Sequence, residues 1–223
     1  MNDCFAATGI VKSETRMLEP FDTLHINRRL NVTLIEDTID YVVVRGGENL
    51  IPQFITELKN GALTLQNENR CNFMRSYKVP VEMEVHFTQL RRVISYGSST
   101  ISSPDTIHKE ALTFEFWNSS TDLNLLIDNN LLEIIQHTGA SDVVVKGRAE
   151  DLIVYMASLG SGDYDELGCN HVYVQTLSSA NCRVFADSTF YFKVNGNGNI
   201  FYKGNGEVIF LERTSGGNVA PIL

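Results

Sequence analysis

Acidic and amide side chains recur along the second half of the chain at a nearly constant spacing. Each of them follows a short run of small residues, and we call the run with its acidic or amide residue a corner. The series is Asp122, Asp142, Asp163, Asn181, Asn199 and Asn218. Ca²⁺ accepts carboxylate oxygens as ligands, so Asp142, Asp163 and Asp165 form a candidate calcium site. The alternative is that each side chain caps its own turn, because Asn replaces Asp without altering the spacing, as an Asx turn allows.

Aromatic side chains form a second series, eight residues before four of these positions. Its members are Tyr155, Tyr173, Tyr191 and Phe210. Apolar residues flank each of them, which predicts that the flanking residues face inward and that the aromatic rings face outward. An exposed aromatic row can stack on sugar rings or contact a partner surface. The rings can equally stabilise the fold by stacking on one another.

No motif indicates a catalytic or cofactor site. The histidines lack the spacing of metal ligands, which argues against zinc. The sequence contains no GxSxG, no P-loop and no GxGxxG before a helix, so we expect no enzyme and no cofactor. The alternative is a lyase or hydrolase acting on polysaccharides, because β-helices often carry such enzymes. Lys146, Arg148 and Glu150 cluster, but without the matching column of acids that such chemistry needs.

The corners repeat from residue 95 to the end of the chain. Seven of them follow one another in steps of 18 to 22 residues. The segments between them, such as Phe190-Tyr191-Phe192, are short and rich in β-branched and aromatic residues, as strands are. This period predicts a parallel, right-handed β-solenoid with about seven coils in residues 95–219. A Greek-key sandwich is the alternative, although it has no reason to repeat one corner.

The part of the chain before residue 95 is also rich in strands but is less regular. Lys59-Asn60-Gly61-Ala62 carries a hairpin signal, and residues 48–54 form the one plausible helical turn. No linker rich in Gly, Ser or Pro separates this part from the repeats. We therefore expect a tail over residues 1–20 and one all-β domain over residues 21–223, in which residues 21–94 cap the repeat coils of 95–223.

One residue follows each corner side chain directly and is expected inside the solenoid. This inward column contains Ile101, Leu123, Val143, Tyr164, Cys182 and Ile200. Cys169 lies six residues past its corner side chain, so we expect no disulfide between Cys169 and Cys182. Cys71 lies in a mostly polar run and is expected to be a free thiol.

Charge and hydropathy limit the possible partners. The chain has 18 basic and 27 acidic side chains and no basic cluster of the kind that nucleic-acid binding needs. No apolar stretch approaches the roughly 20 residues that span a bilayer. The first residues carry no secretory signal, whereas Cys4 lies where the lipidated cysteine of a bacterial lipoprotein would follow a cleaved signal. Cys4 is therefore a candidate lipid anchor and the one membrane attachment to consider, and the alternative is an ordinary cysteine of the tail.

The order of these elements resembles the auto-transporter adhesin head GIN domain family. The resemblance rests on Phe21-Asp22-Thr23-Leu24-His25-Ile26, Tyr41-Val42-Val43-Val44, Asn60-Gly61-Ala62-Leu63-Thr64-Leu65 and the corner Gly160-Ser161-Gly162-Asp163. It covers about Phe21 to Leu223 and implies a β-solenoid exported to the envelope of Gram-negative bacteria, often as a lipoprotein, with no catalytic residues. We therefore expect a structural or binding module in the periplasm or at the cell surface, with carbohydrate or another envelope protein as its partner.

Overall fold

The structure is a computed structural model that describes residues 8–69 and 81–222. Within these residues it consists of β-strands and one short 3-10 helix, which confirms the predicted all-β class, and no helix is long and apolar enough to cross a membrane. The elements are β1 (Val11–Met17), β2 (Thr23–Asn27), β3 (Leu30–Glu36), β4 (Tyr41–Gly47), η2 (Ile51–Gln53), β5 (Phe54–Lys59), β6 (Ala62–Asn67), β7 (Glu82–Phe87), β8 (Arg92–Ile107), β9 (Ala111–Gln136), β10 (Asp142–Met156), β11 (Gly162–Thr176), β12 (Cys182–Val194), β13 (Ile200–Lys203), β14 (Glu207–Arg213) and β15 (Val219–Pro221).

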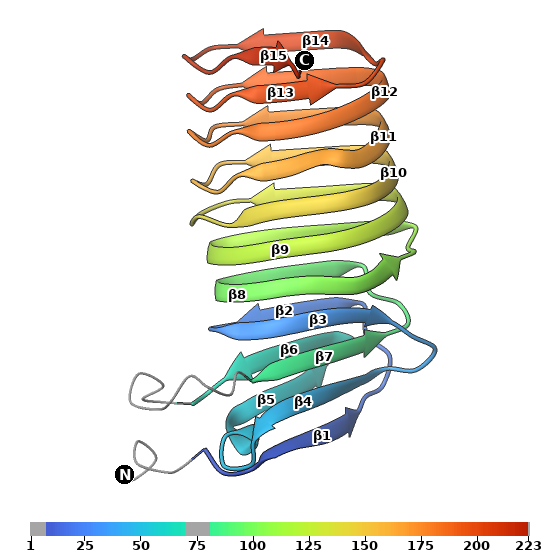
Figure 1. The fold of residues 1–223 in the computed structure, drawn as a ribbon, viewed down its shortest axis with the longest axis vertical. Coiled ribbons are helices and arrows are strands. Elements are labelled where there is room, and N and C mark those ends of the chain that lie inside the picture. Colours follow the sequence, from blue (N-terminus) through green and yellow to red (C-terminus); the bar gives the residue numbers. More distant parts are fainter. Residues whose placement is uncertain (1–7, 70–80, 223) are drawn as a thin grey trace.

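The strands wind into coils that stack along one axis (Figure 1). β8, β9, β10, β11 and β12 are successive neighbours in the sheet, and each pairs parallel with the next. The stack has about six turns, slightly fewer than the seven coils that the corners predict. The predicted parallel β-solenoid is therefore confirmed.

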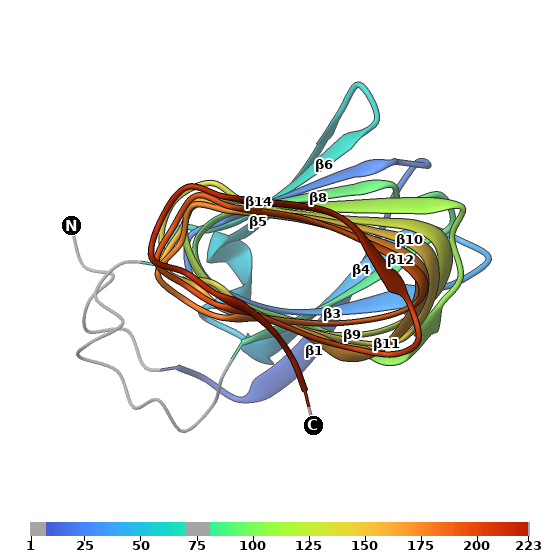
Figure 2. The ribbon, with the colours of Figure 1, turned by 90° about the horizontal axis from the view of Figure 1, so that it is seen from above.

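Seen along the axis, the coils superpose in a flattened outline with two long walls (Figure 2). Side chains alternate between the inside and the outside of each strand, as in any pleated sheet. Leu132, Leu152 and Val172 follow one another in register on neighbouring coils, and each is at most 1% exposed. Full burial of such a side chain contributes roughly 1.5–3 kcal/mol, so columns of this kind make the core.

The corner side chains form hydrogen bonds from coil to coil. Asp142 Oδ1 accepts hydrogen bonds from the backbone N–H and the hydroxyl of Ser161, at 2.9 and 2.6 Å. Asn181 Oδ1 accepts one from the N–H of Asn199 at 3.2 Å, and Asn199 Oδ1 accepts one from the N–H of Asn218 at 3.0 Å. Asp142, Asn181 and Asn199 thus hold neighbouring coils in register, and do not only cap their own turns. Asp163, in contrast, caps its own turn as the alternative predicts, because its Oδ1 accepts a hydrogen bond from the N–H of Asp165 at 3.2 Å.

One coil departs from the predicted register by two residues. Gly162, and not Tyr164, pairs with Val143 on one side and with Cys182 on the other. Ser161 therefore continues the corner column in place of Asp163. The other members of the inward column pair as predicted, and they are Ile101, Leu123, Val143, Cys182 and Ile200.

The ring of Tyr164 explains this departure. Gly162 leaves a space in the interior, and the fully buried Tyr164 from the same strand fills it, since a Cβ on Gly162 would lie 2.6 Å from Tyr164 Cε2. The Tyr164 hydroxyl has no hydrogen-bond partner within the described residues. Burial in this apolar setting raises the pKa of Tyr164 well above its usual value.

The N-terminal part continues the stack and then closes it. β2 and β3 pair parallel with β8, so the solenoid begins before residue 95. β4 pairs antiparallel with β7, and β1 with β4, so residues 11–17 of the expected tail form a strand. The segment around η2 crosses the inside of the outline (Figure 2) and buries Leu50, Ile51 and Phe54 in the core. This apolar plug closes the N-terminal end.

Two local expectations for this part are confirmed. β5 and β6 pair antiparallel around Asn60 and Gly61, whose φ angles of 50° and 77° are those of a tight hairpin turn. The expected helical turn is η2, with Pro52 in its first positions, where a missing N–H costs no hydrogen bond.

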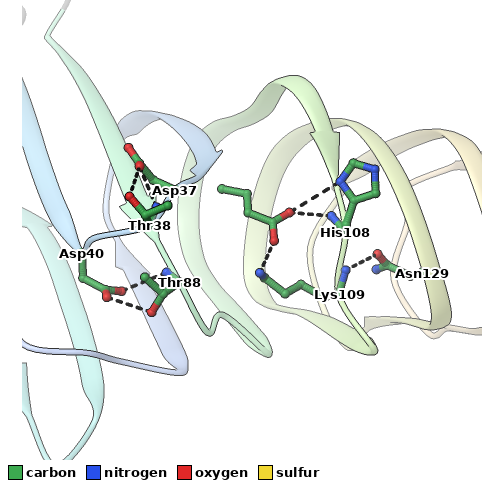
Figure 3. A network of polar contacts seen from close by, with 8 residues as sticks. Asp37, Thr38, Asp40, Thr88, His108, Lys109 and Asn129 are labelled. Atoms are coloured by element: carbon green, nitrogen blue, oxygen red, sulfur yellow. Dashed lines mark hydrogen bonds and ion pairs between the residues drawn. The ribbon is translucent and has the colours of Figure 1, made fainter.

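A polar network joins the N-terminal part to the first coils (Figure 3). The carboxylate of Glu36, at the end of β3, accepts hydrogen bonds from the backbone N–H of His108 at 2.7 Å and from the ammonium of Lys109. The N–H of Lys109 in turn donates to Asn129 Oδ1 at 3.0 Å, one coil farther on. Burial raises the pKa of Glu36, but these hydrogen bonds outweigh that effect and hold the pKa below its usual value.

The fit between Gly162 and Tyr164 is testable by overpacking. Gly162→Ala should lower the free energy of unfolding by about 1–3 kcal/mol, because the added methyl group would meet the Tyr164 ring. The matched control is Gly168→Ala in the same strand, where an added Cβ would meet only the Gly147 carbonyl oxygen at 3.7 Å. Urea unfolding compares the two variants, and Tyr164→Val should relieve the loss in the Gly162→Ala background. Equal and small losses in both single variants would contradict the fit.

The Glu36 network predicts a dependence of stability on pH. Glu36→Gln should lower the free energy of unfolding by about 1.5 kcal/mol at neutral pH, because charge-assisted hydrogen bonds are lost. A carboxylate with a lowered pKa stabilises the fold above its unfolded pKa, and this contribution disappears as the pH falls through the folded pKa. The variant and the natural protein should therefore converge in urea unfolding at acidic pH. Glu19→Gln, at an exposed position, is the control, and a difference that persists in acid would rule out this role.

Candidate functional site

One outward wall of the solenoid carries an aromatic side chain on every coil from β2 to β14. We call this face the aromatic wall. It combines β2, the first part of β8, both ends of β9, the second parts of β10, β11 and β12, and β14. Its aromatic residues are His25, Tyr96, Trp117, His137, Tyr155, Tyr173, Tyr191 and Phe210.

The four predicted aromatic residues do not form one straight column. Tyr173 pairs with Tyr191, and Tyr191 pairs with Phe210, as expected. Tyr155, in contrast, pairs with Gln175, and the residue in register with Tyr173 on that coil is Ile153. The prediction for Tyr155 is wrong because it counts eight residues back from Asp163. The residue of this coil that lies in the corner column is Ser161, two residues earlier.

The predicted outward orientation holds for the row of Tyr173, Tyr191 and Phe210. Its flanking residues on β11 and β12 are buried, whereas Tyr191 is 37% exposed and Phe210 is 41% exposed. Tyr173 is half-buried, and its hydroxyl lies 3.5 Å from Gln175 Oε1. The row therefore places aromatic rings on the outer surface of a rigid sheet.

The first half of the aromatic wall is stacked, and the second half is not. The His137 ring lies 3.6 Å from the Trp117 ring, centroid to centroid, and 6.1 Å from that of Tyr155. Tyr173, Tyr191 and Phe210, all within the described residues, make no ring-to-ring contact of this kind. The Lys193 ammonium lies over the Phe210 ring, 6.0 Å from its centroid, in a cation–π contact. Mutual stacking thus accounts for the first half alone.

Glu115 is a part of the aromatic wall that sequence reasoning missed. Its side chain faces outward yet is only 8% exposed. The Trp117 indole N–H donates to Oε2 at 3.1 Å, His137 Nε2 lies 3.9 Å from the same oxygen, and Arg92 pairs with Oε1. Both carboxylate oxygens are thus engaged, so Glu115 orients the indole ring and is not presented as a free acid. The alternation Glu115-Phe116-Trp117 could have placed Glu115 beside Trp117, but Arg92 comes from a different coil.

The predicted calcium ligands are held by other groups. Asp142 accepts hydrogen bonds from Ser161 at the corner. Arg183 Nε lies 3.2 Å from Asp165 and 3.9 Å from Asp163, and Lys203 Nζ lies 3.8 Å from Asp165, so two cationic side chains face these two carboxylates. In the described ranges, no three His, Cys, Asp or Glu side chains form a group that could hold a metal ion. Calcium binding stays a prediction.

The two cysteines within the described residues are buried and free, as expected. Burial raises the pKa of the Cys169 thiol to about 12 and also raises that of Cys182. Both thiols are therefore protonated and unreactive in the folded chain. Cys4 and Cys71 lie outside the described residues, so the lipid anchor and the free thiol at position 71 stay predictions.

Comparisons with known proteins agree with this fold. A family model described as "Putative auto-transporter adhesin, head GIN domain" matches residues 20–206. A solved structure of a "putative adhesin" from Bacteroides fragilis is similar with a TM-score of 0.85 at 15% identity, covering 96% of this chain and 97% of the other. A "putative adhesin" from Parabacteroides distasonis has a TM-score of 0.70 at 16% identity, with 96% and 98% covered.

A third solved structure, titled "putative lipid binding protein" and also from Parabacteroides distasonis, has a TM-score of 0.69 at 14% identity, with 97% and 98% covered. Comparison with curated proteins gave no match. At these identities, the solved structures show that the fold is shared.

Proposed function

We propose a surface-binding function for this chain, which belongs to the putative auto-transporter adhesin, head GIN domain, family. In this proposal the protein is a non-enzymatic module of the bacterial envelope or cell surface, and its ligand is carbohydrate. The family description and the adhesin-like neighbours support a role in binding. Export and a lipid anchor at Cys4 belong to the same proposal.

The observation that carries the proposal is the exposed row of Tyr173, Tyr191 and Phe210. Rings that do not stack on one another keep apolar surface available, and soluble proteins usually cover or use such surface. Backbones of neighbouring coils lie ~4.8 Å apart, so the rings are closely and regularly spaced. Within this unstacked row, Tyr191 and Phe210 are exposed and Tyr173 is half-buried.

A row of hydrogen-bonding side chains runs beside these rings and favours carbohydrate over a purely apolar ligand. Gln175, Lys193 and Glu212 pair in register, and each follows an aromatic residue by two positions on its strand. All six side chains therefore point to the same side of the sheet. A sugar ring offers an apolar face for stacking and hydroxyl groups for such donors and acceptors.

The arrangement of acids supports a non-enzymatic role. Glycoside hydrolysis needs two carboxyl groups free to transfer protons or attack the sugar. On the aromatic wall, both oxygens of Glu115 are engaged, and Glu133 accepts a hydrogen bond from Thr113 at 3.1 Å. Glu212 lies in register with Lys193 and Gln175, so neither of the two side chains that precede it in this row is a carboxylate. In the sequence cluster of Lys146, Arg148 and Glu150, the Lys146 ammonium is held in an ion pair with Glu166 at 2.8 Å.

The proposal predicts that binding is lost without loss of the fold. Replacing both Tyr173 and Tyr191 with Ser should abolish the glycan-array signal of the natural protein, at a cost of less than about 2 kcal/mol, because these side chains are only partly buried. Phe185→Ser, a half-buried aromatic residue on the opposite wall, is the matched control and should retain binding.

Phe192→Ser provides the reference for a core position, since Phe192 is fully buried and its loss should cost about 3–5 kcal/mol. If the double variant unfolds as readily as Phe192→Ser, the tyrosines belong to the core. If the natural protein binds no glycan, or the double variant binds as well as the natural protein, the proposed function fails.

A further inference from the structure

The sequence contains four Asn-Gly pairs, and all four lie between strands. They are Asn60-Gly61, Asn195-Gly196, Asn197-Gly198 and Asn205-Gly206. In such a pair the backbone nitrogen of the glycine can attack the side-chain amide carbon of the asparagine, because glycine has no side chain to hinder the approach. The attack requires the asparagine side chain and the glycine N–H to move toward each other. The surroundings of each pair therefore decide whether it can react.

Two of the pairs are held by hydrogen bonds of the glycine itself. The N–H of Gly198 donates to the carbonyl of Ser178 at 2.9 Å, on the preceding coil. The N–H of Gly206 donates in the same way to the carbonyl of Ala186 at 3.0 Å. The attacking nitrogen is thus engaged in both pairs, and attack would first have to break a contact between stacked coils.

A third pair is held through its asparagine and is closely packed. The side-chain amide of Asn195 donates to Thr214 Oγ1 at 2.8 Å. Gly196 is buried, and a Cβ at this position would lie 2.2 Å from the carbonyl oxygen of Ser178. Neither member of this pair can therefore turn toward the other without loosening the coil.

The fourth pair, Asn60-Gly61, is not held in this way. It forms the tip of the β5–β6 hairpin, which projects beyond the outline of the coils (Figure 2). Asn60 is exposed, and within the described residues neither its side chain nor the N–H of Gly61 forms a hydrogen bond. A Cβ on Gly61 would meet no atom within 4 Å. Backbone rotation at such a tip costs little free energy, because few contacts are broken.

We propose that Asn60 converts spontaneously to isoaspartate in the folded protein. The Gly61 nitrogen loses its proton to hydroxide and forms a bond to Asn60 Cγ, while the Cγ–Nδ2 bond breaks and the amide group takes up a proton and leaves as ammonia. One water molecule then opens the resulting succinimide ring. Opening at Cγ gives aspartate, and opening at the backbone carbonyl carbon gives isoaspartate, in which the main chain runs through Cγ.

Isoaspartate would alter this hairpin because it adds one backbone atom to a two-residue turn. Lys59 pairs with Ala62 across the turn, and the length of the turn sets the register of a hairpin. The carbonyl of Gly61 also accepts hydrogen bonds from the N–H groups of Asp22 and Thr23, at 3.1 and 3.4 Å. The modification would therefore disturb both the hairpin and its attachment to β2. This inference does not depend on the proposed function.

Peptide mapping of aged protein tests the site. After prolonged incubation of the natural protein at mildly alkaline pH, digestion with pepsin in acid and mass spectrometry measure the conversion of each pair. Asn60 should convert at least about fivefold faster than the asparagine of any other pair, because the other three pairs must first lose a hydrogen bond. The same incubation in urea, where the chain is unfolded, should give similar rates for all four pairs.

The two conditions separate local reaction from reaction of unfolded chains, since transient global unfolding would affect all four pairs alike. No conversion at Asn60 in the folded protein, or equal rates for the four pairs without urea, would overturn the proposal.

Urea unfolding tests the effect on the hairpin. The isoaspartate form, separated by chromatography, should unfold at a lower urea concentration than the natural protein. Freshly purified Asn60→Asp is the matched control, because it carries the same added charge on a backbone of normal length and should unfold close to the natural protein. Equal urea midpoints for the isoaspartate form and Asn60→Asp would rule out the disturbed turn.

Discussion

Parallel stacking of coils in register is the constraint on which the rest of this structure depends. It brings the same position of each coil back at intervals of ~4.8 Å, so one residue is followed by its equivalents along the whole stack. Inside, each such column must be apolar, as Leu132, Leu152 and Val172 are. At the corner, Asp142 and Asn181 can form hydrogen bonds to the next coil because the next corner lies directly beside them. On the outer surface, in-register stacking places few demands on the type of side chain, so residues there can vary from coil to coil.

The division between inside and outside also separates the aromatic residues of the core from those that we propose to bind a ligand. Phe190 and Phe192 fill the core, and Tyr191 between them faces solvent. Along the outer wall, Trp117 and His137 stabilise each other by stacking, helped by the carboxylate of Glu115. Among the described residues, the rings of Tyr173, Tyr191 and Phe210 make no such stacking contact, which is why we place the proposed ligand beside them.

Most of the architecture could be predicted from the sequence because its period is visible there. The corners and the alternation of strands determine the fold class and the buried face of each strand. The predicted register is wrong for one coil. There Gly162 takes an inward position without a side chain, and the ring of Tyr164 fills the space, so the usual apolar residue is absent from that position of the sequence. Tyr155 is misplaced for the same reason, because its position in the aromatic row is predicted by counting eight residues back from Asp163. The pair of Arg92 and Glu115 could not be predicted, because it joins neighbouring coils 23 residues apart.

Distance measurement along the corner column tests the in-register stack most directly. Spin labels at the exposed positions Asp122 and Asn218, in a chain lacking Cys4 and Cys71, report on coils that are five steps apart in the observed register. At ~4.8 Å for each step, double electron–electron resonance should give one narrow distribution centred near 24 Å. Dilution with unlabelled protein restricts the measurement to distances within one chain. A centre beyond about 35 Å, or several separate distances, would show that the coils do not stack in this register.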